Sequence, residues 1–169
     1  MASIVPPRIR WAVDGLGLSS WHRVLEIGCG NGASCTPICE RTGIGQYLGI
    51  DRSEKMIAAA RHRNAAWMAS GVAVFECIDA ALLEISGTCF DRILAINVNL
   101  FWRQADATLE RLYPLLAPEG QLHLVFEPPR AAQITDIAHA CMHSLSLYGF
   151  RSFVQRREDR YWCVQAVHR

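Results

Sequence analysis

Short apolar runs alternate with stretches of helical periodicity along this chain of 169 residues. Short, bounded apolar runs are typical of buried strands, and apolar positions recurring every three or four residues are typical of amphipathic helices. We predict strands at 23–27, 46–50, 72–77, 91–96, 121–126, 150–156 and 161–167. We predict helices at 8–18, 31–42, 53–69, 79–85 and 103–116, and a last one with Ile134, Ile137, Ala138, Cys141 and Leu145 on one stripe.

Strands and helices alternate five times before the last two strands, which have only a charged turn between them at 157–160. Alternation of this kind implies right-handed crossovers, and strands joined by a short turn form a hairpin. The pattern predicts an α/β fold: a doubly wound, seven-stranded, mostly parallel sheet with an antiparallel C-terminal hairpin strand and helices on both faces. We expect one domain at 21–169, preceded by a helical segment at 1–20 that is a candidate lid.

The run Val-Leu-Glu-Ile-Gly-Cys-Gly-Asn-Gly at 24–32 is the most informative part of the chain. An apolar strand ends here in three glycines at alternate positions, Gly28, Gly30 and Gly32, with Glu26 two residues before the first. Glycine has no Cβ and reaches positive φ without strain, so the backbone can approach a ligand closely. Taken alone, the glycines also fit a purely structural turn or a dinucleotide site.

Further polar residues follow the next three strands. Asp51 ends the second strand, Asp79 follows the third, and Asn97 follows the fourth. In a doubly wound sheet, ligands bind at the carboxyl ends of the strands, where the strand order reverses. Asp51 there is suited to hold both hydroxyls of a ribose, and the alternative is a solvated acid. Asp79 fits either a ligand contact or the N-cap of a helix, and the two roles are compatible.

Together with the 115–121 segment before the fifth strand, these motifs resemble the class I S-adenosylmethionine-dependent methyltransferases, over nearly the whole chain from about residue 21. The resemblance implies that the glycine turn passes beneath the methionine part of the cofactor, oriented by Glu26. It also implies that Asp51 holds the ribose with Arg52 beside the adenine, and that Asp79 accepts from the adenine amino group. The residues to which it gives a cofactor contact are Glu26, Gly28, Cys29, Gly30, Gly32, Asp51, Arg52, Met56, Asp79, Ala80 and Asn97.

A nicotinamide cofactor is the first alternative, because Ala33 stands where the dinucleotide fingerprint takes glycine or alanine. Glu26 argues against it, since dinucleotide-binding strands usually keep that position apolar. Asp79 and Asn97 have no place in that fingerprint either. S-adenosylmethionine, converted to S-adenosylhomocysteine, is therefore the predicted cofactor. A non-catalytic protein that senses either compound would carry the same binding residues, so this second alternative stays open.

The acceptor of the methyl group is expected beside the residues that follow the fourth and fifth strands. Asn99, Phe101, Trp102 and Glu127 are the candidate acceptor contacts. Phe101 and Trp102 equally fit packing in the core, and Asn99 equally fits a helix cap. Glu127 fits an amine-binding group, a base or a structural hydrogen-bond acceptor. Glu127 and Asn99 are the candidates for catalysis, although methyl transfer requires a base only if the nucleophile arrives protonated.

Composition narrows the classes of partner. The formal net charge is +1, so no basic excess indicates nucleic acid, and we favour a small-molecule acceptor. No apolar stretch approaches about 18 residues, so no membrane span is predicted. The seven cysteines fall mostly in apolar runs, which favours buried thiols in a reducing cytoplasm, and no metal site is predicted. We therefore expect a cytoplasmic methyltransferase, and a homodimer is left open.

Overall fold

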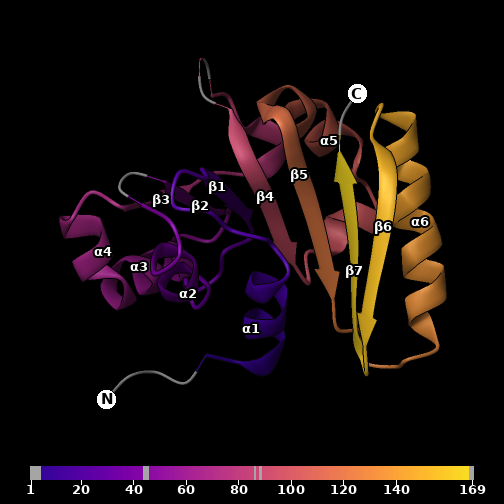
Figure 1. Ribbon diagram of the computed structural model, residues 1–169, viewed down its shortest axis with the longest axis horizontal. Coiled ribbons are helices and arrows are strands. Elements are labelled where there is room, and N and C mark those ends of the chain that lie inside the picture. The colour runs from indigo at the N-terminus through magenta and orange to yellow at the C-terminus, as the bar shows by residue number, and fades with distance from the viewer. Residues whose placement is uncertain (1–4, 44–45, 86, 88, 168–169) are drawn as a thin grey trace.

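The computed structural model describes residues 5–43, 46–85, 87 and 89–167, and it forms one seven-stranded sheet with helices on both faces (Figure 1). The strands are β1 Val24–Ile27, β2 Tyr47–Asp51, β3 Ala73–Cys77, β4 Phe90–Ile96, β5 Leu116–Phe126, β6 Arg151–Glu158 and β7 Tyr161–Val167. The α-helices are α1 Pro7–Asp14, α2 Cys35–Cys39, α3 Glu54–Arg63, α4 Ala65–Ala69, α5 Asp106–Leu112 and α6 Gln133–Leu147. Three short 3₁₀ helices are η1 Ala80–Leu82, η2 Asn99–Trp102 and η3 Tyr113–Leu115.

The strand order is β3-β2-β1-β4-β5-β7-β6, which confirms the predicted doubly wound α/β fold. Strands β1 to β5 pair in parallel, and β7 runs antiparallel between β5 and β6. The order reverses between β1 and β4, because the chain returns to the centre of the sheet after β3. The carboxyl ends of β1, β2, β3 and β4 therefore meet on one edge, and this is the edge where such sheets bind ligands.

Two apolar layers cover the sheet. One face packs against α1, α2 and α3 through residues such as Val13, Ile38 and Ile57. The other face packs against η1, α5 and α6 through residues such as Leu83, Leu109 and Cys141. Figure 1 shows α1 to α4 gathered on one side of the sheet and α6 on the other. Within the described part of the chain, no helix combines the length and the apolarity needed to cross a bilayer.

The helix predicted at 31–42 is much shorter than expected. It covers only Cys35–Cys39, and the residues before it form turns. Gly32 has φ +67°, a left-handed conformation that no α-helix contains. The glycine turn therefore extends further along the chain than the apolar pattern indicated, and the helix begins only after it.

The helix predicted at 53–69 is divided at Asn64 into α3 and α4. Ser53 caps α3 as expected, because its side chain accepts a hydrogen bond from the Met56 amide. Asn64 is buried, and its Nδ2 donates to the carbonyls of Ala60 and Gly32 at 2.9 and 3.1 Å. An asparagine side chain that bonds to nearby backbone carbonyls competes with the helix, which accounts for the break.

Two more boundaries differ from the prediction. The helix expected at 103–116 is α5, which begins at Asp106 and gives way to η3 around Pro114, because proline cannot continue an α-helix. The last turn is shorter than the predicted 157–160: β6 extends to Glu158 and β7 begins at Tyr161. Asp159 has φ +48°, and a left-handed residue allows a two-residue turn between antiparallel strands.

Candidate functional site

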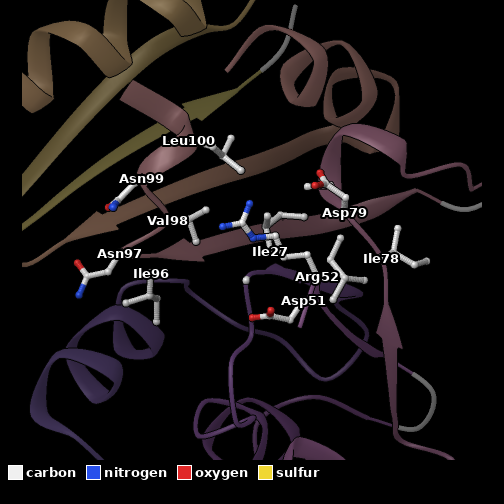
Figure 2. Close-up of a pocket in the computed structure, with 13 residues that line it drawn as sticks. Ile27, Asp51, Arg52, Ile78, Asp79, Ile96, Asn97, Val98, Asn99 and Leu100 are labelled. Carbon is white, nitrogen blue, oxygen red and sulfur yellow. The ribbon is translucent and has the colours of Figure 1, made fainter. Parts of the chain in front are cut away.

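A cavity of about 400 Å³ lies at the carboxyl ends of β1 to β4. Its lining residues are Ile27, Gly28, Ile50, Asp51, Arg52, Ile78, Asp79, Ala80, Ile96, Asn97, Val98, Asn99 and Leu100 (Figure 2). Strand-end polar groups surround a mostly apolar floor, which is the usual composition of a site for a small organic ligand. The strands thus bring together seven of the predicted site residues, although these are scattered over 70 positions of sequence between Gly28 and Asn99.

The three glycines of the turn all have left-handed backbone, with φ of +67°, +54° and +67°. A Cβ on Gly28 would lie 2.7 Å from Val98 Cγ2, so this glycine permits close packing against the β4 loop. A Cβ on Gly30 would meet nothing within 4 Å, so it would project into open space. Gly28 therefore serves the packing of the turn against the β4 loop, whereas no neighbouring atom restricts the space beside Gly30.

Glu26 lies beneath the glycine turn and does not line the cavity. Its Oε2 accepts hydrogen bonds from the Ser34 hydroxyl and, at 2.6 Å, from the Tyr47 hydroxyl. The bond from Ser34 joins β1 to the start of α2, so it connects the two segments that flank the turn. The bond from Tyr47 joins β1 to the neighbouring strand β2. Burial, with a smaller contribution from the Asp51 charge and against the two hydroxyl hydrogen bonds, raises the pKa of Glu26 to about 7.

Asp51 connects the end of β2 to the glycine turn. Its Oδ2 accepts from the Gly30 amide at 3.0 Å, and its Oδ1 accepts from the Ser53 amide at 2.9 Å. A carboxylate has about four acceptor positions, so two remain for hydroxyl donors of a ligand. Arg52 is exposed, and Figure 2 shows its side chain extending across the cavity.

Asp79 caps the 3₁₀ helix that follows β3, since its Oδ1 accepts from the Ala81 amide at 2.9 Å. Its side chain also lines the cavity, with Ala80 beside it. The cap is therefore present, and the predicted contact with a ligand remains compatible with it. Figure 2 places Asp79 near Ile78, at the opposite end of the cavity from Asn97 and Asn99.

Besides Glu26, four predicted cofactor residues do not line the cavity: Cys29, Gly30, Gly32 and Met56. Cys29 is buried in the core behind the turn, and Gly32 packs against α3. Met56 is 40% exposed on α3. The prediction missed the apolar floor, formed by Ile27, Ile50, Ile78 and Ile96 with Val98 and Leu100. The signal was available, because four of these are apolar residues at or next to the end of a parallel strand.

Asn97 joins the β4 end of the cavity to the end of β5. It has left-handed backbone with φ +56°, which asparagine tolerates better than most residues. Its Oδ1 accepts from the Glu127 amide at 2.7 Å, and its own amide donates to the Val125 carbonyl at 2.8 Å. Asn99 also lines the cavity, as the first residue of η2, and the N-cap of α5 is Ala105, so Asn99 does not cap the helix for which it was the alternative.

The aromatic residues expected to form a wall of the acceptor site belong to the core instead. Phe101 is 1% exposed, and Trp102 packs edge-on against Phe126 with ring centroids 4.6 Å apart. The short η2 helix, which the sequence did not predict, turns both rings inward toward α6. Neither side chain lines the cavity, so the packing alternative describes them correctly.

Glu127 forms ion pairs with two arginines from distant parts of the chain. Arg8 Nη1 of α1 lies 3.2 Å from its Oε2, and Arg160 Nε of the hairpin turn lies 3.0 Å from its Oε1. The Glu127 side chain is only 17% exposed. Both carboxylate oxygens are engaged by cations, as a structural hydrogen-bond acceptor would be, and an amine-binding or base role of Glu127 stays a prediction. The sequence carried no signal that these residues meet.

His123 is a buried polar residue on β5 that does not belong to the cavity. Its Nε2 lies 3.1 Å from Gln121 Oε1, as expected of a core histidine with a hydrogen-bond partner. Burial lowers its pKa to about 3, with smaller contributions from the positive charges of Arg92 and Arg156. His123 is therefore neutral at physiological pH.

Comparisons with known proteins agree with this site. The sequence model of the family described as "Methyltransferase domain" matches residues 24–120. The chain is 34% identical to the trans-aconitate 2-methyltransferase of Acidovorax sp. (strain JS42) over 102 residues, covering 60% of this chain and 36% of that protein. Among the curated relatives it matches, the chain spans between 36% and 65% of their length.

Solved structures share the fold. Magnesium protoporphyrin IX methyltransferase from Synechocystis PCC 6803, crystallised with S-adenosylhomocysteine, superposes with a TM-score of 0.67 at 20% identity, over 95% of this chain and 80% of that one. The [4+2]-cyclase SpnF superposes with a TM-score of 0.75 at 17% identity, over the same shares. The family match covers more than half of the chain, and the strand order and glycine turn agree with it. The chain therefore belongs to the class I S-adenosylmethionine-dependent methyltransferases.

Proposed function

We propose that this protein binds S-adenosylmethionine in the cavity at the carboxyl ends of β1 to β4 and transfers its methyl group to a small-molecule acceptor. The observation that carries the proposal is that Gly28, Asp51 and Asp79 line one cavity of about 400 Å³, a volume suited to a small organic ligand.

The residues present fit this cofactor. Asp51 retains two acceptor positions for the ribose hydroxyls, and Asp79 lies where it can accept from an adenine amino group. Ile50 and Ile78 offer flat apolar contact to a purine. The open space over Gly30 leaves room for the chain that carries the sulfur. Asp51 also bonds to the Gly30 amide, so ribose binding and the shape of the turn are coupled through one side chain.

When bound, S-adenosylmethionine supplies a methyl group on a positively charged sulfur, which becomes a neutral thioether as the acceptor's lone pair takes the methyl carbon. The task left to the protein is alignment, which alone supplies a large part of the acceleration of such displacements. Asn97 and the glycine turn fix the walls of the cavity on either side of Val98. A residue has to accept a proton for this step only if the acceptor arrives protonated.

Two observations support a small-molecule acceptor. The formal net charge of +1 is not the large basic excess that is typical of nucleic-acid-binding proteins. Two of the similar proteins act, by their names, on trans-aconitate and magnesium protoporphyrin IX, both small molecules. The fold is also shared by a [4+2]-cyclase, so the fold alone does not specify the reaction.

The test uses the purified chain and two ligands. Isothermal titration with S-adenosylhomocysteine is expected to show binding, and titration with NAD is expected to show none. Transfer of a tritiated methyl group from S-adenosylmethionine to a metabolite extract then separates an enzyme from a sensor. Binding of NAD alone would overturn the cofactor, and tight cofactor binding without any transfer would favour the sensor.

A further inference from the structure

The ion pairs at Glu127 leave positive charge unbalanced. One carboxylate faces two guanidinium groups, those of Arg8 and Arg160, and each contributes a single close nitrogen. The Arg8 and Arg160 side chains are 39% and 54% exposed, so part of each guanidinium group is accessible. The Nε of Arg8 is buried and has no hydrogen-bond partner among the described residues. Glu127 therefore fixes two arginines without neutralising both.

A third arginine lies against the same part of α1. Arg156 of β6 stacks over the Trp11 ring at 4.2 Å and donates to the Trp11 carbonyl at 3.0 Å. Trp11 also contacts the Tyr161 ring, with centroids 5.6 Å apart. The hairpin turn adds Arg157 and two exposed acids, Glu158 and Asp159. With every charge named here counted, the cluster still has one more positive charge than negative.

This cluster borders the β4 end of the cavity. Asn97 lines the cavity, and its Oδ1 accepts from the Glu127 amide at 2.7 Å, so one residue separates the cavity wall from the two arginines. Figure 2 shows Asn97 and Asn99 at the end of the cavity away from Asp79. If the adenine lies at Asp79, the reactive end of the cofactor points toward Asn97, on the side where Arg8 and Arg160 lie.

We propose that the methyl acceptor is a small anion, bearing a carboxylate or a phosphate, and that Arg8 and Arg160 bind its charged group. This inference rests on the proposed function and specifies the acceptor. Guanidinium groups bind both kinds of oxyanion through paired N–H donors. Attraction to these arginines and to the positively charged sulfur would act in the same direction and would draw an anion into the site.

The test separates acceptors by charge. A small-molecule extract is divided on an anion exchanger, and each fraction is incubated with the protein and tritiated S-adenosylmethionine. We expect the label to enter products from the retained, anionic fraction. Citrate and glycerol 3-phosphate, added separately as competitors, distinguish a carboxylate from a phosphate by which one inhibits. Label entering only the unretained fraction would overturn the inference while leaving methyl transfer intact.

Variants distinguish substrate binding from anchoring of α1. Arg160→Gln is expected to reduce labelling of the anionic fraction about tenfold or more, with unchanged affinity for S-adenosylhomocysteine, because it removes charged hydrogen bonds. Arg160→Lys is expected to retain part of the activity, since the charge remains. Arg41→Gln is the matched control: Arg41 also ties α1 to the domain, through Asp14 at 2.6 Å.

The Arg41 variant is expected to label the anionic fraction like the unaltered protein. Equal losses in the Arg160→Gln and Arg41→Gln variants would show that the arginines only hold α1 in place, and this would overturn the proposal. If the unaltered protein did not bind S-adenosylhomocysteine, the proposed function itself would be overturned. The two failures are therefore distinguishable.

Discussion

The β2–β3 end of the cavity and its β4–β5 end are assembled from different contacts. At the first, backbone turns and the strand-end acids Asp51 and Asp79 come from consecutive segments of the chain. At the second, Asn97 bonds to Glu127, which pairs with arginines from α1 and the hairpin turn. Local backbone geometry thus shapes the end that fits a fixed cofactor. Long-range ion pairs shape the end at which we propose that the acceptor binds.

Two buried titratable groups in the sheet, Glu26 on β1 and His123 on β5, also have pKa values that shift in opposite directions. The pKa of Glu26, under the glycine turn, is raised by burial, whereas the pKa of His123, on β5, is lowered by burial. Both shifts favour the neutral form, because a charge is poorly solvated in the interior. Because Glu26 is an acid and His123 is a base, their contributions to folding stability depend on pH in opposite directions.

The largest expected effect on stability comes from substitutions in the glycine turn. They distinguish a glycine that is tightly packed from one that has open space beside it. Gly32→Ala should lower the free energy of unfolding by about 2–5 kcal/mol, from left-handed strain and overpacking. Its Cβ would lie 2.5 Å from Asn64 Nδ2 and 3.1 Å from Ala60 Cβ. Gly30→Ala has open space and should cost only about 1–2 kcal/mol of strain. Urea denaturation without ligand measures both, and equal losses would contradict this distinction.

The pH dependence of stability comes next. A raised carboxyl pKa in the folded state contributes stability below the ordinary value of 4.5, and that contribution is lost as pH rises toward 7. A lowered histidine pKa contributes stability above 6.5, and that contribution is lost as pH falls toward 3. Between pH 4.5 and 6.5 the contributions of Glu26 and His123 oppose each other.

Replacing one group should leave the pH dependence of stability that the other group causes. That dependence is at most about 1.4 kcal/mol of unfolding free energy for each pH unit. In Glu26→Gln, stability should fall more steeply than in the unaltered protein as pH drops below 6.5. In His123→Leu, stability should instead rise as pH drops from 7 to 4.5. Urea midpoints across this range test both, and parallel profiles for the two variants would rule out the opposition.

At the cofactor end, Asp51→Ala should weaken binding of S-adenosylhomocysteine by about 1–3 kcal/mol, because hydroxyl donors lose their acceptor and the Gly30 amide loses its partner. Isothermal titration measures the change. Asp14→Ala provides the control, since Asp14 is an exposed acid paired with Arg41. An unchanged dissociation constant in the Asp51 variant would remove the ribose assignment.

The smallest expected effect is at the β4–β5 connection. Asn97→Ala loses the bond to the Glu127 amide and also places alanine at φ +56°, whereas Asn97→Gly loses only the bond. The alanine variant should be less stable than the glycine variant by about 1 kcal/mol. Denaturation compares them. Equal stability would mean that the backbone of the β4 loop relaxes and does not hold the cavity wall.

The sequence by itself determined the fold class and most of the cofactor end. Parallel strands bring their carboxyl ends to one edge, so Gly28, Asp51, Asp79 and Asn97 meet wherever strands and helices alternate as they do here. Only the tertiary structure decided that Phe101 lies in the core and that Asn64 interrupts a helix, since both follow from packing against distant elements. The pairing of Glu127 with Arg8, 119 residues earlier, follows no local pattern, because an ion pair across the fold is specified only once the strands have been placed.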